Sequence, residues 1–161
     1  MIRYYEYEDI EDIAKLIDDN WKSAYRGIID DEFLDNLNYK DRAERQKKKY
    51  EKEKSIVYIE NEEILGFCRL GESREGLEDY GEVIALYVRQ DIHGKGIGKK
   101  LINKAKEILK SKGYNKMILW CLKENKNARG FYEKVGGVLG KERKFEIGNK
   151  EYDEVSYIYE I

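Results

Sequence analysis

The chain of 161 residues contains no proline, a single histidine, two cysteines and no long apolar run. Without proline, its turns must depend on glycine, asparagine and aspartate. A membrane-spanning helix needs about 18 consecutive apolar residues, and no segment approaches that length. The first residues, Met1–Glu6, lack the basic and apolar regions of a secretory signal. We therefore expect a cytoplasmic protein that does not enter a membrane.

The two cysteines, Cys68 and Cys121, lie in the apolar runs Gly66–Leu70 and Met117–Leu122, which read as strands. Free cysteines commonly behave as small buried hydrophobes, so we predict buried thiols rather than a disulfide or a nucleophile. No metal site is expected. A chain of this length can bury a substantial core, and we expect one domain over residues 1–161.

The net charge of −2 conceals two segments of opposite sign. Residues 1–35 carry eleven acidic and four basic side chains, whereas residues 89–116 carry nine basic and two acidic ones. The basic segment coincides with a glycine-rich turn, which indicates an anion site; uneven charge along solvated helices is the alternative. In Lys40–Lys54 acids interleave with the lysines, so we predict a solvated helix face and no nucleic-acid site.

Apolar spacing predicts an α/β chain with a mixed sheet of about seven strands and helices on both faces. The expected helices are Glu8–Trp21, Asp30–Leu37, a helix after the glycine turn that ends at Gly113, and Lys126–Val135. The expected strands are Ile2–Tyr7, Ser55–Glu60, Ile64–Leu70, Glu82–Val88, Met117–Leu122, Val138–Ile147 and Lys150–Ile161. The last two strands meet across Gly148-Asn149, a two-residue hairpin signal.

The turn His93-Gly94-Lys95-Gly96-Ile97-Gly98 follows an apolar strand and precedes an amphipathic helix. Such a turn brings backbone N–H groups and the positive end of the helix dipole close to an anion. A Walker loop is excluded, because His93 replaces its first glycine and Lys100 its serine or threonine. A dinucleotide fingerprint fails at its last glycine, since the glycine falls at position 98 and not at Lys99.

The turn instead resembles the phosphate-binding turn of the GNAT acetyltransferases. Two further segments resemble the same family: the central strand Glu82–Val88, and Asn125–Lys134, which is similar to the signature Asn-x-x-Ala-x-x-Phe-Tyr-Glu-Lys and is followed by Gly136-Gly137. His93 stands where the family usually has Gln or Arg, and Val138 where it commonly has Phe. The resemblance covers about residues 82–140 and implies the GNAT fold over one domain.

The resemblance implies acetyl-CoA as the cosubstrate. Its pyrophosphate would lie on the backbone of the glycine turn, its pantetheine would pair with the end of the central strand, and Asn125 would hold its amide groups, with a further phosphate contact from Arg129. The implied cosubstrate-binding residues are Leu86, Tyr87, Val88, His93, Gly94, Lys95, Gly96, Ile97, Gly98, Lys99, Asn125 and Arg129.

The implied reaction is direct attack of a primary amine on the thioester in a ternary complex. Tyr132 holds the family's general-acid position and would protonate the leaving thiolate; a core aromatic is the alternative. Glu82 stands where relatives often place a general base, although a solvent-facing glutamate at a strand end would look the same. A non-catalytic acyl-CoA-binding regulatory domain is the alternative for the whole chain.

The acceptor is expected to be cationic, such as a polyamine or a basic amine on a small molecule or peptide. Segments that enclose the acceptor in this family are acidic here, and aromatic residues are interleaved with them. The candidate acceptor-binding residues are Trp21, Tyr25 and Tyr80. Relatives are often homodimers, so a homodimer is a further expectation.

Overall fold

The computed structural model describes residues 1–161. Its strands are β1 (Ile2–Tyr4), β2 (Ser55–Glu60), β3 (Glu63–Glu72), β4 (Tyr80–Val88), β5 (Lys116–Leu122), β6 (Val138–Ile147) and β7 (Lys150–Glu160). Its α-helices are α1 (Ile10–Ala24), α2 (Asp31–Asp35), α3 (Tyr39–Lys48), α4 (Ile97–Ser111) and α5 (Lys126–Lys134). Short 3-10 helices are η1 (Tyr7–Asp9), η2 (Lys52–Lys54) and η3 (Gln90–Ile92).

The seven strands form a sheet in the order β1-β2-β3-β4-β5-β7-β6. Strands β4 and β5 are parallel, whereas β1 with β2, β2 with β3, β5 with β7 and β6 with β7 are antiparallel. This confirms the predicted α/β class and mixed sheet. The chain groups into two compact units, unit 1 with residues 1–69 and 85–104 and unit 2 with residues 70–84 and 105–161.

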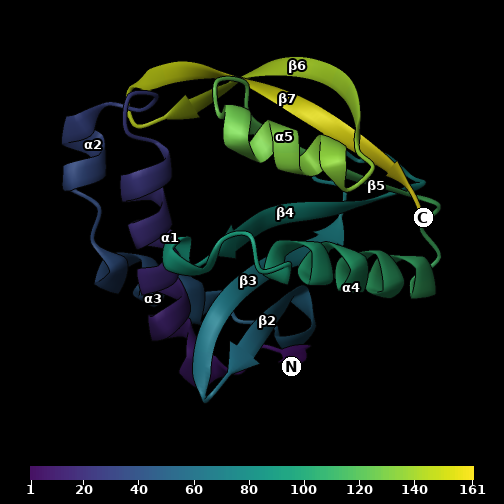
Figure 1. The fold of residues 1–161 in the computed structure, drawn as a ribbon, viewed down its shortest axis with the longest axis horizontal. Helices are drawn as coiled ribbons and strands as arrows, with labels where there is room; N and C mark the ends of the chain where they lie inside the picture. The colour runs from purple at the N-terminus through teal and green to yellow at the C-terminus, as the bar shows by residue number, and fades with distance from the viewer. The chain divides into compact units, whose positions relative to one another are not determined.

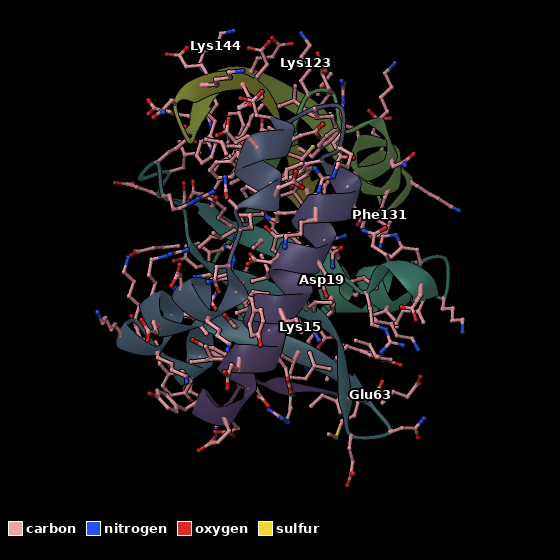
Figure 2. All side chains as sticks on the ribbon, turned by 90° about the vertical axis from the view of Figure 1, so that its left-hand side faces the viewer. Lys15, Asp19, Glu63, Lys123, Phe131 and Lys144 are labelled. Atoms are coloured by element: carbon pink, nitrogen blue, oxygen red, sulfur yellow. The ribbon has the colours of Figure 1, made fainter.

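In unit 1, α1 buries its apolar stripe against a core that includes Tyr5, Val57 and Phe67. Helix α3 lies beside α1 (Figure 1). A buried ion pair joins the two helices, because the Nε of Arg42 donates to the Oδ1 of Asp18 at 2.5 Å. The exposed side of α1 carries Lys15 and Asp19, which Figure 2 shows one turn apart on this helix.

In unit 2, β5 pairs with the first half of β4 on one side and with β7 on the other. Helix α5 lies along the sheet part that ends in the long β6–β7 hairpin (Figure 1). The Tyr159 hydroxyl donates to the Tyr132 carbonyl at 2.9 Å, which attaches β7 to α5. Gly81 permits close packing of α4, because a Cβ there would lie 2.6 Å from Leu109.

The first strand is shorter than predicted, and a 3-10 turn replaces its second half. The Asp9 carboxylate causes this change, since it accepts from the Glu6 N–H at 2.7 Å and from the Arg3 guanidinium at 2.8 and 3.1 Å. These bonds draw the chain into a turn after Tyr4. The charged segment predicted as one stretch, Lys40–Lys54, forms α3 and then the separate turn η2.

Both cysteines are free thiols, with Cys68 fully buried and Cys121 half-buried. Burial raises the pKa of each thiol to about 12. The prediction of a buried, unpaired thiol in a strand is therefore confirmed for Cys68. Cys121 is also unpaired, but it is half-buried and so more accessible than predicted.

Candidate functional site

The glycine turn of unit 1 connects η3 with the first turn of α4. Gly94 and Gly96 have φ angles of +87° and +80°, in the left-handed region that favours glycine. No atom lies within 4 Å of the position that a Cβ would take at either residue. The turn therefore presents bare backbone to open space. A diphosphate fits such a surface, because nothing but glycine hydrogens limits its approach.

Helix α4 begins directly after this turn, at the buried Ile97. Its first backbone hydrogen bond runs from the Lys100 N–H to the Gly96 carbonyl at 3.1 Å. By helix geometry, the N–H groups before Lys100 have no partner within the helix and point out of its N-terminus. Lys95 and Lys99 are exposed beside them. The turn thus joins a positive helix end to two ammonium groups.

His93 folds back onto the strand that precedes the turn. Its Nε2 lies 2.9 Å from the Val88 carbonyl oxygen. A carbonyl can only accept, so this nitrogen carries the proton. The ring therefore closes the connection between β4 and α4, which gives His93 a part in stabilising the turn.

The end of β4 is attached to α1 through a side chain. The indole Nε1 of Trp21 donates to the Tyr87 hydroxyl at 2.9 Å. Burial raises the pKa of Tyr87. Tyr25 contacts the Trp21 ring edge-on, with 5.0 Å between the ring centroids. Unit 1 therefore brings the predicted acceptor residues Trp21 and Tyr25 together with Tyr87, a residue predicted to bind CoA through its backbone.

Glu82, in unit 2, is not a solvent-facing residue, because only 1% of it is exposed. Both of its carboxylate oxygens accept hydrogen bonds from Arg74 of the β3–β4 loop. The Arg74 N–H donates to Oε1 at 3.0 Å, and the guanidinium Nε donates to Oε2 at 2.8 Å. A second guanidinium nitrogen, Nη2, also donates to Oε2. The carboxylate therefore sits buried on β4 with a partly exposed cation over it.

Tyr132 lies half-buried on α5, where its ring contacts Phe131 and Tyr157 at centroid distances of 5.4 and 6.0 Å. Its backbone carbonyl accepts from Tyr159 and from the Gly137 N–H, both at 2.9 Å. A Cβ at residue 137 would lie 2.8 Å from that carbonyl, so the paired glycines let the chain turn closely under Tyr132. The helix end that carries this tyrosine is thus fixed from two sides.

Asn125 is the N-cap of α5, and its Oδ1 accepts from the Ala128 N–H at 3.3 Å. Its amide nitrogen is the part of the side chain that can reach a ligand. Arg129 points to the sheet instead, since it donates to the Tyr157 hydroxyl at 2.9 Å and to the Lys123 carbonyl at 3.1 Å. These bonds give Arg129 a structural role that phosphate binding would disrupt.

Tyr80 begins β4 in unit 2, and the Lys116 ammonium lies over its ring at 5.6 Å. Both residues line a cavity of about 410 Å³ that also contacts Lys106 and Tyr159. The ring of Tyr80 therefore already faces the Lys116 ammonium, just as the ring of Trp21 already faces the Arg42 guanidinium at 5.5 Å.

Ion pairs reduce the acidic surface that the sequence suggested. Asp18 is buried against Arg42, and Arg26 binds Asp31 at 3.1 Å and Asp35 at 2.6 Å. The spacing of α1 could have revealed Asp18, because it lies one helical turn after Ala14 on the buried face. Nothing in the sequence pattern pairs Arg74 with Glu82, so that contact was missed.

No three or more histidine, cysteine or acidic side chains are grouped to hold a metal ion. Among the helices, none has both the length and the apolar character to pass through a bilayer. The candidate residues are thus divided between the two units. Unit 1 carries the glycine turn, the end of β4, Trp21 and Tyr25, whereas unit 2 carries Tyr80, Glu82, Asn125, Arg129 and Tyr132.

The model of the acetyltransferase (GNAT) family matches residues 13–137. The chain is 32% identical over 155 residues to YuaI, an uncharacterized N-acetyltransferase of Bacillus subtilis, with 96% of this chain and 89% of the relative covered. It is 26% identical over 150 residues to the spermidine N(1)-acetyltransferase of Thermoplasma acidophilum, with 84% and 86% covered. The crystal structure of the PaiA N-acetyltransferase of T. acidophilum in complex with coenzyme A is similar with a TM-score of 0.76, 23% identity and 96% of both chains covered.

Proposed function

We propose that this chain, which belongs to the acetyltransferase (GNAT) family, catalyses direct attack of a primary amine on acetyl-CoA, in a ternary complex of enzyme, amine and acetyl-CoA. The enzyme is an N-acetyltransferase, and acetyl-CoA is its cosubstrate. The observation that carries the proposal is the family match over the segment that contains the open glycine turn and the Asn125–Lys134 signature.

We assign pyrophosphate binding to the backbone of residues 94–99. The left-handed Gly94 and Gly96 and the first turn of α4 support this, because they combine close backbone approach with unpaired N–H groups and the helix dipole. The exposed Lys95 and Lys99 add long-range attraction for the phosphates. Backbone groups at Leu86–Val88 are assigned to pantetheine and to the developing oxyanion.

Tyr132 is the proposed general acid. A thiol has a pKa of about 8.5 and a phenol of about 10, so a phenol beside the sulfur can protonate the leaving thiolate with little penalty. The rigid support of the Tyr132 backbone by Tyr159 and Gly137 favours this role, since a proton donor must be held within hydrogen-bond reach.

Glu82 is the proposed general base. An ordinary primary amine has a pKa near 10.4, so only about one molecule in 10³ is unprotonated at pH 7, and a group must remove the proton. Burial of the Glu82 carboxylate supports the role, because a buried carboxylate attracts a cation more strongly than one in bulk water.

The proposed acceptor is a cationic amine, with a polyamine as the first candidate. Two observations support this choice. The relative from T. acidophilum is a spermidine acetyltransferase. Trp21 and Tyr25 form an aromatic pair, and the Trp21 ring already attracts one cation, the Arg42 guanidinium at 5.5 Å. Exposed acids on α1 and α2, such as Asp19 and Glu32, add attraction at a distance.

The experiment is a screen in which release of the free thiol of CoA from acetyl-CoA is followed with spermidine, aminoglycosides, amino acids and peptides. We expect turnover with at least one cationic amine and its loss in Glu82→Gln. Binding of acetyl-CoA without thiol release for any amine would instead favour the non-catalytic acyl-CoA-binding alternative.

A further inference from the structure

The β3–β4 loop of unit 2 covers the proposed base with one of its own cations. Residues Arg74–Asp79 of this loop are exposed, whereas Glu82 beneath them is 1% exposed. Arg74 donates to both oxygens of that carboxylate, through its backbone and its guanidinium. In this state the carboxylate is already paired with a cation and accepts three hydrogen bonds from Arg74, so an acceptor ammonium group must compete with Arg74 for it.

We propose that Arg74 occupies the place of the acceptor's cation at Glu82, and that a cationic acceptor must displace it before reaction. This inference rests on the proposed role of Glu82 as the base. Under this proposal, Arg74 sets the apparent affinity of the enzyme for amines. Residues 74–78 form a cover over the Glu82 carboxylate, and this cover opens when a competing cation binds.

The attachments of the loop are suited to such opening. Its two ends are fixed, because Ser73 is buried and the Asp79 carbonyl accepts from the N–H groups of Asn115 and Lys116, both at 3.2 Å. Between these ends, Leu77 remains 39% exposed, and Gly76 has a φ of +71°. The middle of the loop is thus held by side-chain contacts rather than by a packed apolar core.

Besides Arg74, a second contact holds the loop closed. The Trp120 indole donates to Glu75 at 3.0 Å, and Arg143 stacks over the Trp120 ring at 4.0 Å while it also lies 3.7 Å from Glu75. This contact does not involve the Glu82 carboxylate. A variant at Trp120 can therefore loosen the loop while the Arg74–Glu82 pair and the proposed base stay intact.

The experiment measures KM for spermidine and kcat separately in Arg74→Ala, Arg74→Lys and Trp120→Phe. If the closed loop predominates about tenfold over the open one, its removal lowers KM about tenfold without lowering kcat. Arg74→Lys keeps the charge and loses the planar two-point contact, so its KM should fall by less. Trp120→Phe should also lower KM, because it removes the hydrogen bond from the indole to Glu75. Arg3→Ala, which removes a comparable two-point pair with Asp9, is the control and should leave KM unchanged.

Addition of guanidinium ion at low millimolar concentration tests whether Arg74 competes with the acceptor for Glu82 or has only a structural role. In Arg74→Ala it should fill the vacated place, raise the melting temperature and inhibit competitively against spermidine, with little effect on the wild type. Activation of Arg74→Ala by guanidinium, or an unchanged or higher KM in both Arg74→Lys and Trp120→Phe, would overturn the proposal. Full activity of Glu82→Gln would overturn the role of the base, and this result is separate from the KM values of the loop variants.

Discussion

Removal of the Tyr132 hydroxyl distinguishes the proposed role of this residue as an acid from its role in aromatic packing. Tyr132→Phe keeps the ring contacts with Phe131 and Tyr157 and removes only the hydroxyl group, which carries the transferable proton. We expect kcat to fall about 10²-fold or more while KM for acetyl-CoA changes little, because the proton is needed only in the transition state. Steady-state kinetics measures this, with Tyr114→Phe, at a half-buried tyrosine just after the end of α4, as the control. An unchanged kcat would make Tyr132 a packing residue.

The thiols provide a test at the residue scale that depends on pH. Burial raises the pKa of Cys68 and of Cys121 to about 12, since it disfavours the charged thiolate. Only about 10⁻⁴ of each thiol is then ionised at pH 8, and the fraction increases as the pH rises toward 12. An aromatic disulfide reagent at pH 8 should modify neither cysteine in the native protein and both after unfolding. Rapid labelling of the native protein would contradict the burial of that thiol.

At the scale of elements, one buried ion pair adds to the apolar packing of α3 against α1. Asp18 and Arg42 have side-chain exposures of 4% and 18%, so solvent screens their contact weakly. Asp18→Asn removes the charge and keeps the shape, and we expect a loss of about 1.5–3 kcal/mol in the free energy of unfolding. Urea denaturation measures it. Asp31→Asn, at an exposed pair with Arg26, is the control and should change stability little.

The turn between η3 and α4 should bind CoA through its backbone. Gly96→Val places a branched side chain where the pyrophosphate would approach, and we expect calorimetry to show no binding of acetyl-CoA. Gly27→Val is a matched control, because Gly27 has the same φ of +80° and equally open surroundings. Equal loss of binding in both variants would point to backbone strain instead. His93→Ala, which leaves the turn backbone in place, should weaken binding by less than about tenfold.

The sequence predicted the elements well where apolar period and glycine position agree. The end of α4 near Gly113 and the final hairpin were both predicted from such local signals. It could not predict η1, because that turn depends on a bond from the Glu6 N–H to the Asp9 carboxylate within a stretch that alternates like a strand. The contact of Arg74 with Glu82 could not be predicted from the sequence either, because it depends on how the polar β3–β4 loop folds back onto β4.

At the scale of the whole molecule, the acidic segment 1–35 and the basic segment 89–116 differ less in unpaired surface charge than their residue counts suggest. Residues 89–116 keep exposed cations beside the glycine turn, including Lys95 and Lys99. In residues 1–35 several acids are instead neutralised, with Asp18 buried and Asp31 and Asp35 paired with Arg26. If the acceptor is the cationic amine proposed above, its attraction comes from the exposed acids that remain, such as Asp19 and Glu32, and from local contacts at aromatic rings.

The acceptor prediction follows from this reduced acidic surface. Spermidine should have a higher kcat/KM than a neutral or anionic amine of similar size, and its advantage should shrink a few-fold between low and moderate ionic strength, because salt screens charges beyond about 10 Å at 0.1 M. The measurement compares kcat/KM for spermidine and for glutamate at the two ionic strengths. Since ion pairs already cancel part of the negative charge, we expect a moderate salt dependence rather than the steep one of a strongly steered enzyme. A preference for glutamate, or spermidine rates that ignore salt, would exclude a cationic acceptor attracted by these acids and leave the family assignment in place.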